Sequence, residues 1–195
     1  MNKVLVTYAT NSGTTADVAR AIGEEIEKSG AQVDVLPLER VTTLAGYAAV
    51  VLGAPMIMGW HRAATAFLKK HQQSLSKVPV ALFVTCISLT QSGETQVDGT
   101  AITVDPALPQ APKQPGRLSF KERYTTVGNY VRPILKAAPQ AKPVSVGIFG
   151  GRLDMYRLKW WQALFVMAII QAQPGEKRNW DAIRSWAGQL AALLH

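Results

Sequence analysis

The sequence contains only one cysteine, Cys86, among its 195 residues. A single cysteine excludes an internal disulfide and a metal site built from a cluster of cysteines. The three histidines, His61, His71 and His195, are too scattered along the chain to predict a metal site. We therefore expect no bound metal ion.

Long apolar runs and targeting signals are also missing. No stretch reaches the roughly 18 apolar residues that a membrane-spanning helix needs. Residues 1–6 read directly into a strand, without the apolar core and cleavage site of a signal peptide. We therefore expect a cytoplasmic protein, or one attached to the cytoplasmic face of the membrane. The length and the 48% hydrophobic content predict one domain over residues 1–195 with a buried core.

Acidic residues are scarce in the C-terminal part of the chain. Residues 113–195 hold 13 Lys and Arg against 4 Asp and Glu, whereas residues 1–112 hold 8 against 9. This asymmetry predicts either an anionic partner or a solubilising surface. We expect no nucleic acid as the partner, because the sequence shows neither stacking aromatics along a strand nor a helix-turn-helix pattern. Anionic lipid and an acidic small molecule remain as candidates.

Strand-like and helix-like segments alternate along the chain. Short apolar or β-branched runs predict strands at residues 4–9, 32–36, 48–53, 78–84 and 143–149. Helical spacing predicts three helices, marked by Val18, Ile22 and Ile26, by Arg62 to Gln73, and by Ile183, Trp186, Leu190 and Leu193. Such alternation implies right-handed crossovers and a parallel sheet. The predicted fold class is α/β, a doubly wound five-stranded sheet in the order 2-1-3-4-5.

The segment 89–140 is far longer than the crossover after the fourth strand needs, so we interpret it as an insertion. Its first part, 90–116, is rich in Gly, Pro, Thr and Gln, which predicts an extended or mobile loop. Ser119 and Glu122 then have the spacing of a capping box. Helical spacing continues through Phe120, Tyr124, Val127, Val131 and Leu135.

The loop between the first strand and the first helix has the composition of a phosphate site. It consists of Thr10, Asn11, Ser12, Gly13, Thr14 and Thr15. Backbone N–H groups at a helix N-terminus, together with short hydroxyl side chains, bind phosphate. The loop has no lysine and no GxGxxG pattern, which excludes a P-loop and a dinucleotide fingerprint. We predict a monophosphate held by neutral donors; the alternative is an ordinary N-cap turn.

The stretch Tyr8–Val18 resembles the FMN phosphate loop of flavodoxins. Over nearly the whole chain, the sequence is similar to the flavodoxin-type, menaquinone-dependent protoporphyrinogen oxidases. This wider similarity rests on Gly53-Ala54, Gly59, His61, Lys69-Lys70-His71, Gly150-Gly151-Arg152-Leu153-Asp154 and Tyr156-Arg157. The resemblance implies a flavodoxin-like fold with non-covalently bound FMN.

In flavodoxin-like proteins, two further loops enclose the flavin ring. By position, the resemblance places here Pro55, Met56, Ile57, Met58, Gly59 and Trp60 after the third strand, and Thr85, Cys86, Ile87, Ser88, Leu89 and Thr90 after the fourth. Trp60 is the expected ring partner. Electron-carrying flavodoxins usually stack a tyrosine on the ring from the later loop, and this chain has none between Cys86 and Arg123. We interpret Cys86 as a buried space-filling residue rather than a redox thiol.

The segment 152–171 joins basic and aromatic residues to an apolar block. Ten of the eleven residues from Trp160 to Ile170 are apolar, which is too many for one face of a surface helix. Three environments fit such a block: the core of this domain, a homo-oligomer interface, or the surface of a membrane. Adjacent tryptophans next to Arg and Lys are typical of the headgroup level.

The resemblance implies an FMN-dependent oxidoreductase that passes electrons from a hydrophobic anionic substrate, such as protoporphyrinogen, to a quinone. The alternative is a flavodoxin-like electron carrier without a substrate of its own. A pI near 9.8 disfavours the carrier, because carriers that dock on basic partners are usually acidic. No catalytic residue is predicted: His61 either moves protons or, as we prefer, only begins a helix.

Overall fold

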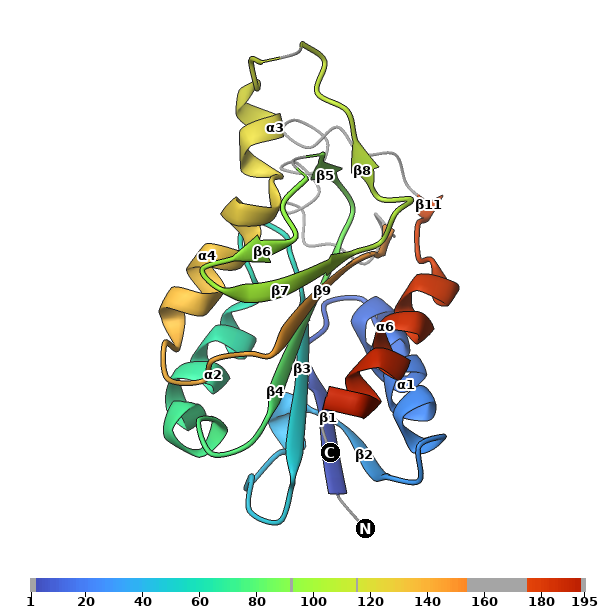
Figure 1. Ribbon diagram of the computed structural model, residues 1–195, viewed down its shortest axis with the longest axis vertical. Helices are drawn as coiled ribbons and strands as arrows, with labels where there is room; N and C mark the ends of the chain where they lie inside the picture. Colours follow the sequence, from blue (N-terminus) through green and yellow to red (C-terminus); the bar gives the residue numbers. More distant parts are fainter. Residues whose placement is uncertain (1–2, 92, 115, 154–174, 194–195) are drawn as a thin grey trace.

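The computed structural model of the protein describes residues 3–91, 93–114, 116–153 and 175–193. Within them, the main sheet has seven strands in the order β2-β1-β3-β4-β9-β7-β6 (Figure 1). Five of these correspond to the predicted strands: β1 (Lys3–Tyr8), β2 (Gln32–Pro37), β3 (Ala49–Pro55), β4 (Val80–Cys86) and β9 (Ser145–Gly150). They pair in parallel in the predicted order, which confirms the doubly wound fold class.

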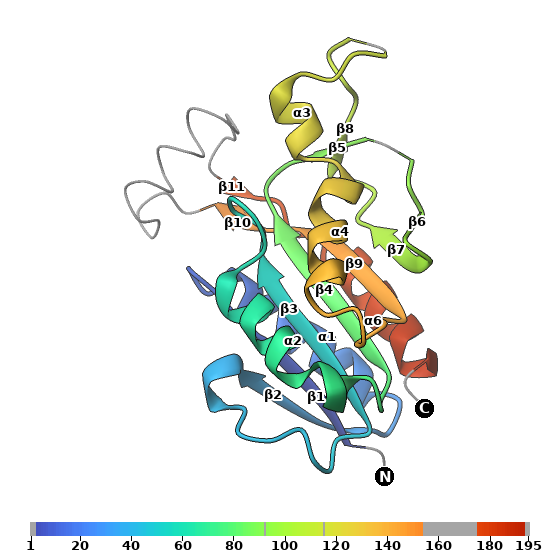
Figure 2. The same ribbon diagram turned by 90° about the vertical axis from the view of Figure 1, so that its left-hand side faces the viewer.

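Helices cover both faces of the sheet (Figures 1 and 2). One face carries α1 (Thr14–Glu27) and α6 (Trp180–Leu193), and the other carries α2 (Arg62–Leu75) and α4 (Val127–Ala137). The alternation along β1 fixes this arrangement, because Val4 and Val6 face α1 whereas Leu5 faces α2. A short 3-10 turn (Leu38–Arg40) follows β2.

The final helix is where the sequence predicts it, with one difference. Ile183, Trp186 and Leu190 are buried against α1 and the sheet, and the Trp186 indole Nε1 donates to the Ser145 hydroxyl at 3.0 Å. Leu193, predicted to belong to the same stripe, is 54% exposed. It lies in the last turn, beyond the part of the helix that packs on the sheet.

The first part of the insertion is ordered into strands, so the prediction of a loop over 90–116 is wrong. It contains β5 (Leu89–Thr90), β6 (Gln96–Val97), β7 (Thr100–Val104) and β8 (Pro109–Gln110). β6 and β7 form a hairpin, and β7 adds in parallel to β9. Asp98 and Gly99 adopt φ of 48° and 82°, as a two-residue hairpin turn requires. The β-branched residues of β7 then extend the sheet.

The helical part of the insertion is divided into α3 (Phe120–Tyr124) and α4. The predicted capping box is confirmed, since the Ser119 and Glu122 side chains bond each other's backbone N–H groups. The predicted continuous spacing is interrupted at Thr125 and Thr126. Thr126 accepts from the Asn129 N–H and begins a new helix, and Phe120 is 71% exposed.

The basic and aromatic segment predicted at 152–171 lies outside the described residues beyond Leu153. Its described flanks form the short pair β10 (Arg152–Leu153) and β11 (Gly175–Glu176). Among the described residues, no helix has the length and apolarity needed to cross a membrane. In the same part of the chain, no group of three or more His, Cys, Asp or Glu residues is placed to hold a metal ion.

Candidate functional site

The carboxyl ends of β1, β3, β4 and β9 bring together segments that are far apart in the sequence. They line one pocket, formed by Thr10, Asn11, Ser12, Thr14, Thr15, Pro55, Met56, Ile57, Thr85, Cys86, Ile87, Gly151 and Arg152. Its volume is about 40 Å³, on a scale where one water needs roughly 10–15 Å³. This is room for an anionic group of phosphate size, so a bound flavin ring would lie outside it, against the neighbouring loops.

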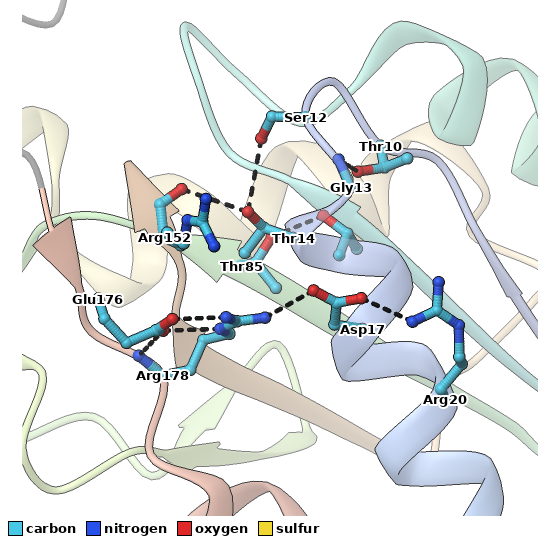
Figure 3. Close-up of polar contacts among 11 residues, drawn as sticks. Thr10, Ser12, Gly13, Thr14, Asp17, Arg20, Thr85, Arg152, Glu176 and Arg178 are labelled. Carbon is cyan, nitrogen blue, oxygen red and sulfur yellow. Dashed lines mark hydrogen bonds and ion pairs between the residues drawn. The ribbon is translucent and has the colours of Figure 1, made fainter. Parts of the chain in front are cut away.

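The loop before α1 is shaped to receive an anion. Gly13 occupies the N-cap position with φ of 89°, a left-handed conformation that favours glycine. Among the described residues, no side chain caps the first turn of α1, so its N–H groups remain available to a ligand. Thr10 Oγ1 accepts from the Gly13 N–H at 2.9 Å, which fixes the loop and leaves the Thr10 hydroxyl proton for an anion (Figure 3).

The other hydroxyls of the loop have different partners. Thr14 Oγ1 donates to the Arg152 carbonyl at 3.3 Å and lies 3.4 Å from Ser12 Oγ. Thr15 is buried, and its hydroxyl is 2.9 Å from that of Thr85 at the end of β4 (Figure 3). The two threonines share one hydrogen bond, so only one of their two hydroxyl protons is used in it.

Several charged side chains surround the start of α1. Asp17, in the first turn of α1, pairs with Arg20 at 2.6 Å and with Arg178 at 2.9 Å. Arg178 also binds Glu176 and holds the pKa of that carboxyl below its usual value. Arg152 lines the pocket itself and lies beside Thr14 and Thr85 (Figure 3). The repulsion between Asp17 and a phosphate is thereby offset.

The loop after β3 forms a miniature hairpin. Met56 bridges Trp60, and Met58 and Gly59 adopt φ of 56° and 101° at its tip. Met58 is 51% exposed. Non-glycine residues rarely adopt this left-handed conformation, and those that do are often found at ligand-binding sites.

Trp60, the expected ring partner, does not line the small pocket. Its side chain is buried in the core, and its indole Nε1 donates to the Ala54 carbonyl at 3.2 Å. His61 begins α2, where its Nδ1 accepts from the Ala63 N–H at 3.3 Å. Burial lowers the pKa of His61. These contacts agree with the interpretation that His61 only begins a helix.

The loop after β4 contains Cys86, which is buried. Burial raises the pKa of its thiol to about 12, so the thiol remains protonated at neutral pH. This agrees with its interpretation as a space-filling residue. Ile87 lines the small pocket, whereas Ser88 and Leu89 line a neighbouring one.

The structure thus brings most of the predicted cofactor residues to one pocket. The predicted residues that do not line it are Gly13, Met58, Gly59, Trp60, Ser88, Leu89 and Thr90. Two lining residues were missed, Gly151 and Arg152. A sequence signal existed for both, because they follow the last strand and therefore lie at the same edge of the parallel sheet as the other loops.

Residues 5–179 match the family model of the flavodoxin domain. The chain belongs to the flavodoxin-domain family. This membership supports FMN as the cofactor, as the sequence predicts. No curated protein sequence matches the chain.

Solved structures with a similar fold include three flavoproteins of low sequence identity. The rubredoxin:oxygen oxidoreductase of the anaerobe Desulfovibrio gigas has a TM-score of 0.50 at 14% identity, over 100% of this chain and 36% of that one. A flavodoxin from the domain Archaea gives 0.47 at 13%, over 98% of both chains. A C101A mutant of Pseudomonas aeruginosa flavodoxin gives 0.47 at 12%, over 98% of both. The chain spans about a third of the oxidoreductase's length.

Proposed function

We propose that this chain is an FMN-dependent oxidoreductase of the protoporphyrinogen oxidase type, which passes electrons from a hydrophobic anionic substrate to a quinone. One observation carries the choice of an enzyme over a carrier. The insertion is attached to both loops that the resemblance places around the flavin ring. We interpret this added structure next to the cofactor site as a cover for a substrate.

The attachment to the loop after β4 is made by hydrogen bonds from the insertion. The Tyr130 hydroxyl, from α4, donates to the Ser88 carbonyl at 2.9 Å. The Thr90 N–H donates to the Thr125 carbonyl at 2.8 Å, and the hydroxyls of the same two threonines lie 2.8 Å apart. The insertion also contacts the loop after β3. The Gly59 backbone forms a hydrogen bond with the Tyr124 hydroxyl, which partly offsets the rise in the pKa of Tyr124 that burial causes.

The residues that would hold FMN follow from the small pocket. The hydroxyls of Thr10 and Ser12 and the N–H groups of the first turn of α1 would bind the phosphate, with Arg152 adding positive charge. The insertion and the exposed Met58 would exclude water from one side of the ring. When bound, FMN supplies the redox chemistry itself by accepting electrons from the substrate and giving them to the acceptor.

The test is anaerobic reduction of the FMN-loaded protein by protoporphyrinogen IX, followed by addition of a menaquinone analogue. We expect bleaching of the flavin absorbance and its faster return with the quinone than with a one-electron protein acceptor. Flavin that is not reduced by porphyrinogen, but exchanges electrons rapidly with a protein acceptor, would establish the carrier instead.

Membrane attachment is part of the same proposal, because menaquinone is a lipid. It is supported by the sequence alone, through Arg157, Lys159 and the pair Trp160 and Trp161. Each basic residue contributes about 1 kcal/mol near an anionic surface, so stable attachment also needs the tryptophans. The protein should sediment with anionic vesicles, and the Trp160→Ser, Trp161→Ser variant should sediment less while keeping FMN. Loss of FMN in that variant would assign the tryptophans to the core or to an oligomer interface.

A further inference from the structure

A second pocket lies inside the insertion, directly beside the loop after β4. It is formed between α3, β5 and β8, beyond the carboxyl ends of the main strands (Figures 1 and 2). Its volume is about 380 Å³, which falls within the roughly 300–1,000 Å³ typical of small-molecule sites. Ser88 and Leu89 belong to its wall, so it adjoins the loop expected at the flavin ring.

Two lysines line this pocket, and a third lies near one of them. Lys113, which follows β8, and Lys121, on α3, both line it. Lys177, just before α6, lies near Lys121 and donates from Nζ to the Ile87 carbonyl at 3.2 Å. Burial lowers the pKa of Lys121, and the ammonium groups of Lys113 and Lys177 lower it further. Like charges held this close are unfavourable unless an anion joins them.

The carboxylate nearest to these lysines is already occupied. Glu122 Oε1 accepts from the Lys113 backbone N–H at 2.7 Å, and Oε2 accepts from the Ser119 N–H and hydroxyl at 2.7 and 2.6 Å. Within the described part of the chain, neither Lys113 nor Lys121 forms an ion pair through its ammonium group. Two lysines and one glutamate line the pocket, which leaves its lining with a net positive charge.

The pocket also has an aromatic wall. Phe120 lines it while remaining 71% exposed. Its ring stacks on Tyr124, with centroids 6.5 Å apart and planes at 24°. Its ring provides a flat apolar surface next to the lysines.

We propose that this pocket binds an organic acid, with Lys113 and Lys121 on its carboxylate and Phe120 against its apolar body. Lys177 adds charge from the side of the flavin loop. The role of the pocket as a substrate subsite rests on the proposed function, whereas the binding of an organic acid does not depend on it.

The experiment measures binding of 2-naphthoate to the FMN-loaded protein by calorimetry, beside the neutral analogue 2-naphthalenemethanol and inorganic phosphate. We expect the naphthoate Kd to rise about a hundredfold in Lys113→Gln, Lys121→Gln, or roughly tenfold for each lysine. The matched control, Lys69→Gln, Lys70→Gln on the exposed face of α2, should bind like the wild type. Phe120→Ala should weaken both naphthalene compounds and leave phosphate unchanged.

Three results would overturn the proposal. They are no binding of naphthoate to the wild type, equal affinity in the pocket and control variants, or phosphate competing as strongly as naphthoate, which would reduce the pocket to a simple anion site. Unchanged thermal unfolding and FMN content of each variant establish that it is folded. If naphthoate binds as expected but porphyrinogen does not reduce the flavin, the proposed function fails and the pocket stands.

Discussion

The loop 10–15 and the insertion pocket both present hydrogen-bond donors to an anion, but they do so by opposite means. The loop uses short hydroxyls and backbone N–H groups that its own bonds hold in place, such as Gly13 to Thr10. The pocket uses the long side chains of Lys113 and Lys121, which come from separate segments.

This difference fits two kinds of ligand. Neutral donors fixed before binding lose little conformational entropy, so they suit a cofactor that stays bound. A lysine is a flexible point charge that loses rotamer freedom when it binds, so lysines suit a ligand that enters and leaves. The loop is therefore suited to a cofactor that stays bound, and the insertion pocket to a ligand that exchanges.

The first prediction tests the role of the loop by removing its neutral hydrogen-bond donors. Thr10→Val with Ser12→Ala should weaken FMN binding roughly a hundredfold or more, because each hydrogen bond to a charged group contributes about 1.5–3 kcal/mol. Fluorescence titration of the apoprotein with FMN measures the loss. Riboflavin, which lacks the phosphate, should bind both proteins equally.

The matched control for that variant is Thr65→Val on α2, which removes a hydroxyl that donates to the His61 carbonyl. It should keep the FMN affinity of the wild type. If the loop variant also keeps the wild-type FMN affinity, the phosphate does not bind at residues 10–15, and the loop is not the site of the cofactor.

The parts of the site that the sequence predicts are those that depend on short stretches of chain. The loop 10–15, the buried parallel strands and the Ser119–Glu122 capping box each extend over a few consecutive residues. Their chemistry follows from local geometry, such as the N–H groups of a first helical turn or the two buried faces of a parallel strand.

The parts that the sequence did not predict depend on contacts between distant segments. The position of Trp60 is decided by core packing and the Ala54 carbonyl, which outweigh its nearness to the flavin loop in the sequence. The convergence of Lys113, Lys121 and Lys177 needs three segments to be placed at once. The Asp98-Gly99 pair is a local signal for the hairpin that contains β7, but it lies in a segment whose overall composition is typical of a loop.

A second prediction asks whether the loop relies on neutral donors alone. Arg152→Gln should weaken FMN binding roughly five- to tenfold at low salt, because one charge beside a phosphate contributes about 1 kcal/mol near water. The effect should shrink at high salt and be absent for riboflavin. Lys28→Gln, which removes an exposed cation at the opposite end of α1, is the control. An unchanged affinity would show that hydroxyls and N–H groups suffice.

A third prediction concerns the hairpin that anchors the insertion to β9. Gly99→Ala should lower the free energy of unfolding by about 1 kcal/mol, because the residue has φ of 82°. The same substitution at Gly188, an exposed position in α6 with open space around it, should raise stability by up to about 1 kcal/mol. Urea unfolding measures both. Equal effects at the two sites would mean that the turn conformation does not determine the cost.

The smallest expected effect tests whether Glu122 organises the pocket. Hydrogen bonds from Ser119 and from the Lys113 N–H lower the pKa of this carboxyl from its ordinary 4.5 to about 2. A carboxyl whose pKa is lowered by folding stabilises the folded state fully when the pH is above the pKa that the group has in the unfolded chain. This contribution is lost as the pH falls through the folded-state pKa of about 2. Glu122→Gln should therefore lower the melting temperature at pH 6, and its difference from the wild type should narrow between pH 4.5 and 2. Glu27→Gln, at an exposed position on α1, is the matched control. A difference between the Glu122→Gln variant and the wild type that stays constant across that pH range would mean that the ionised carboxylate does not hold α3 in place beside the lysines.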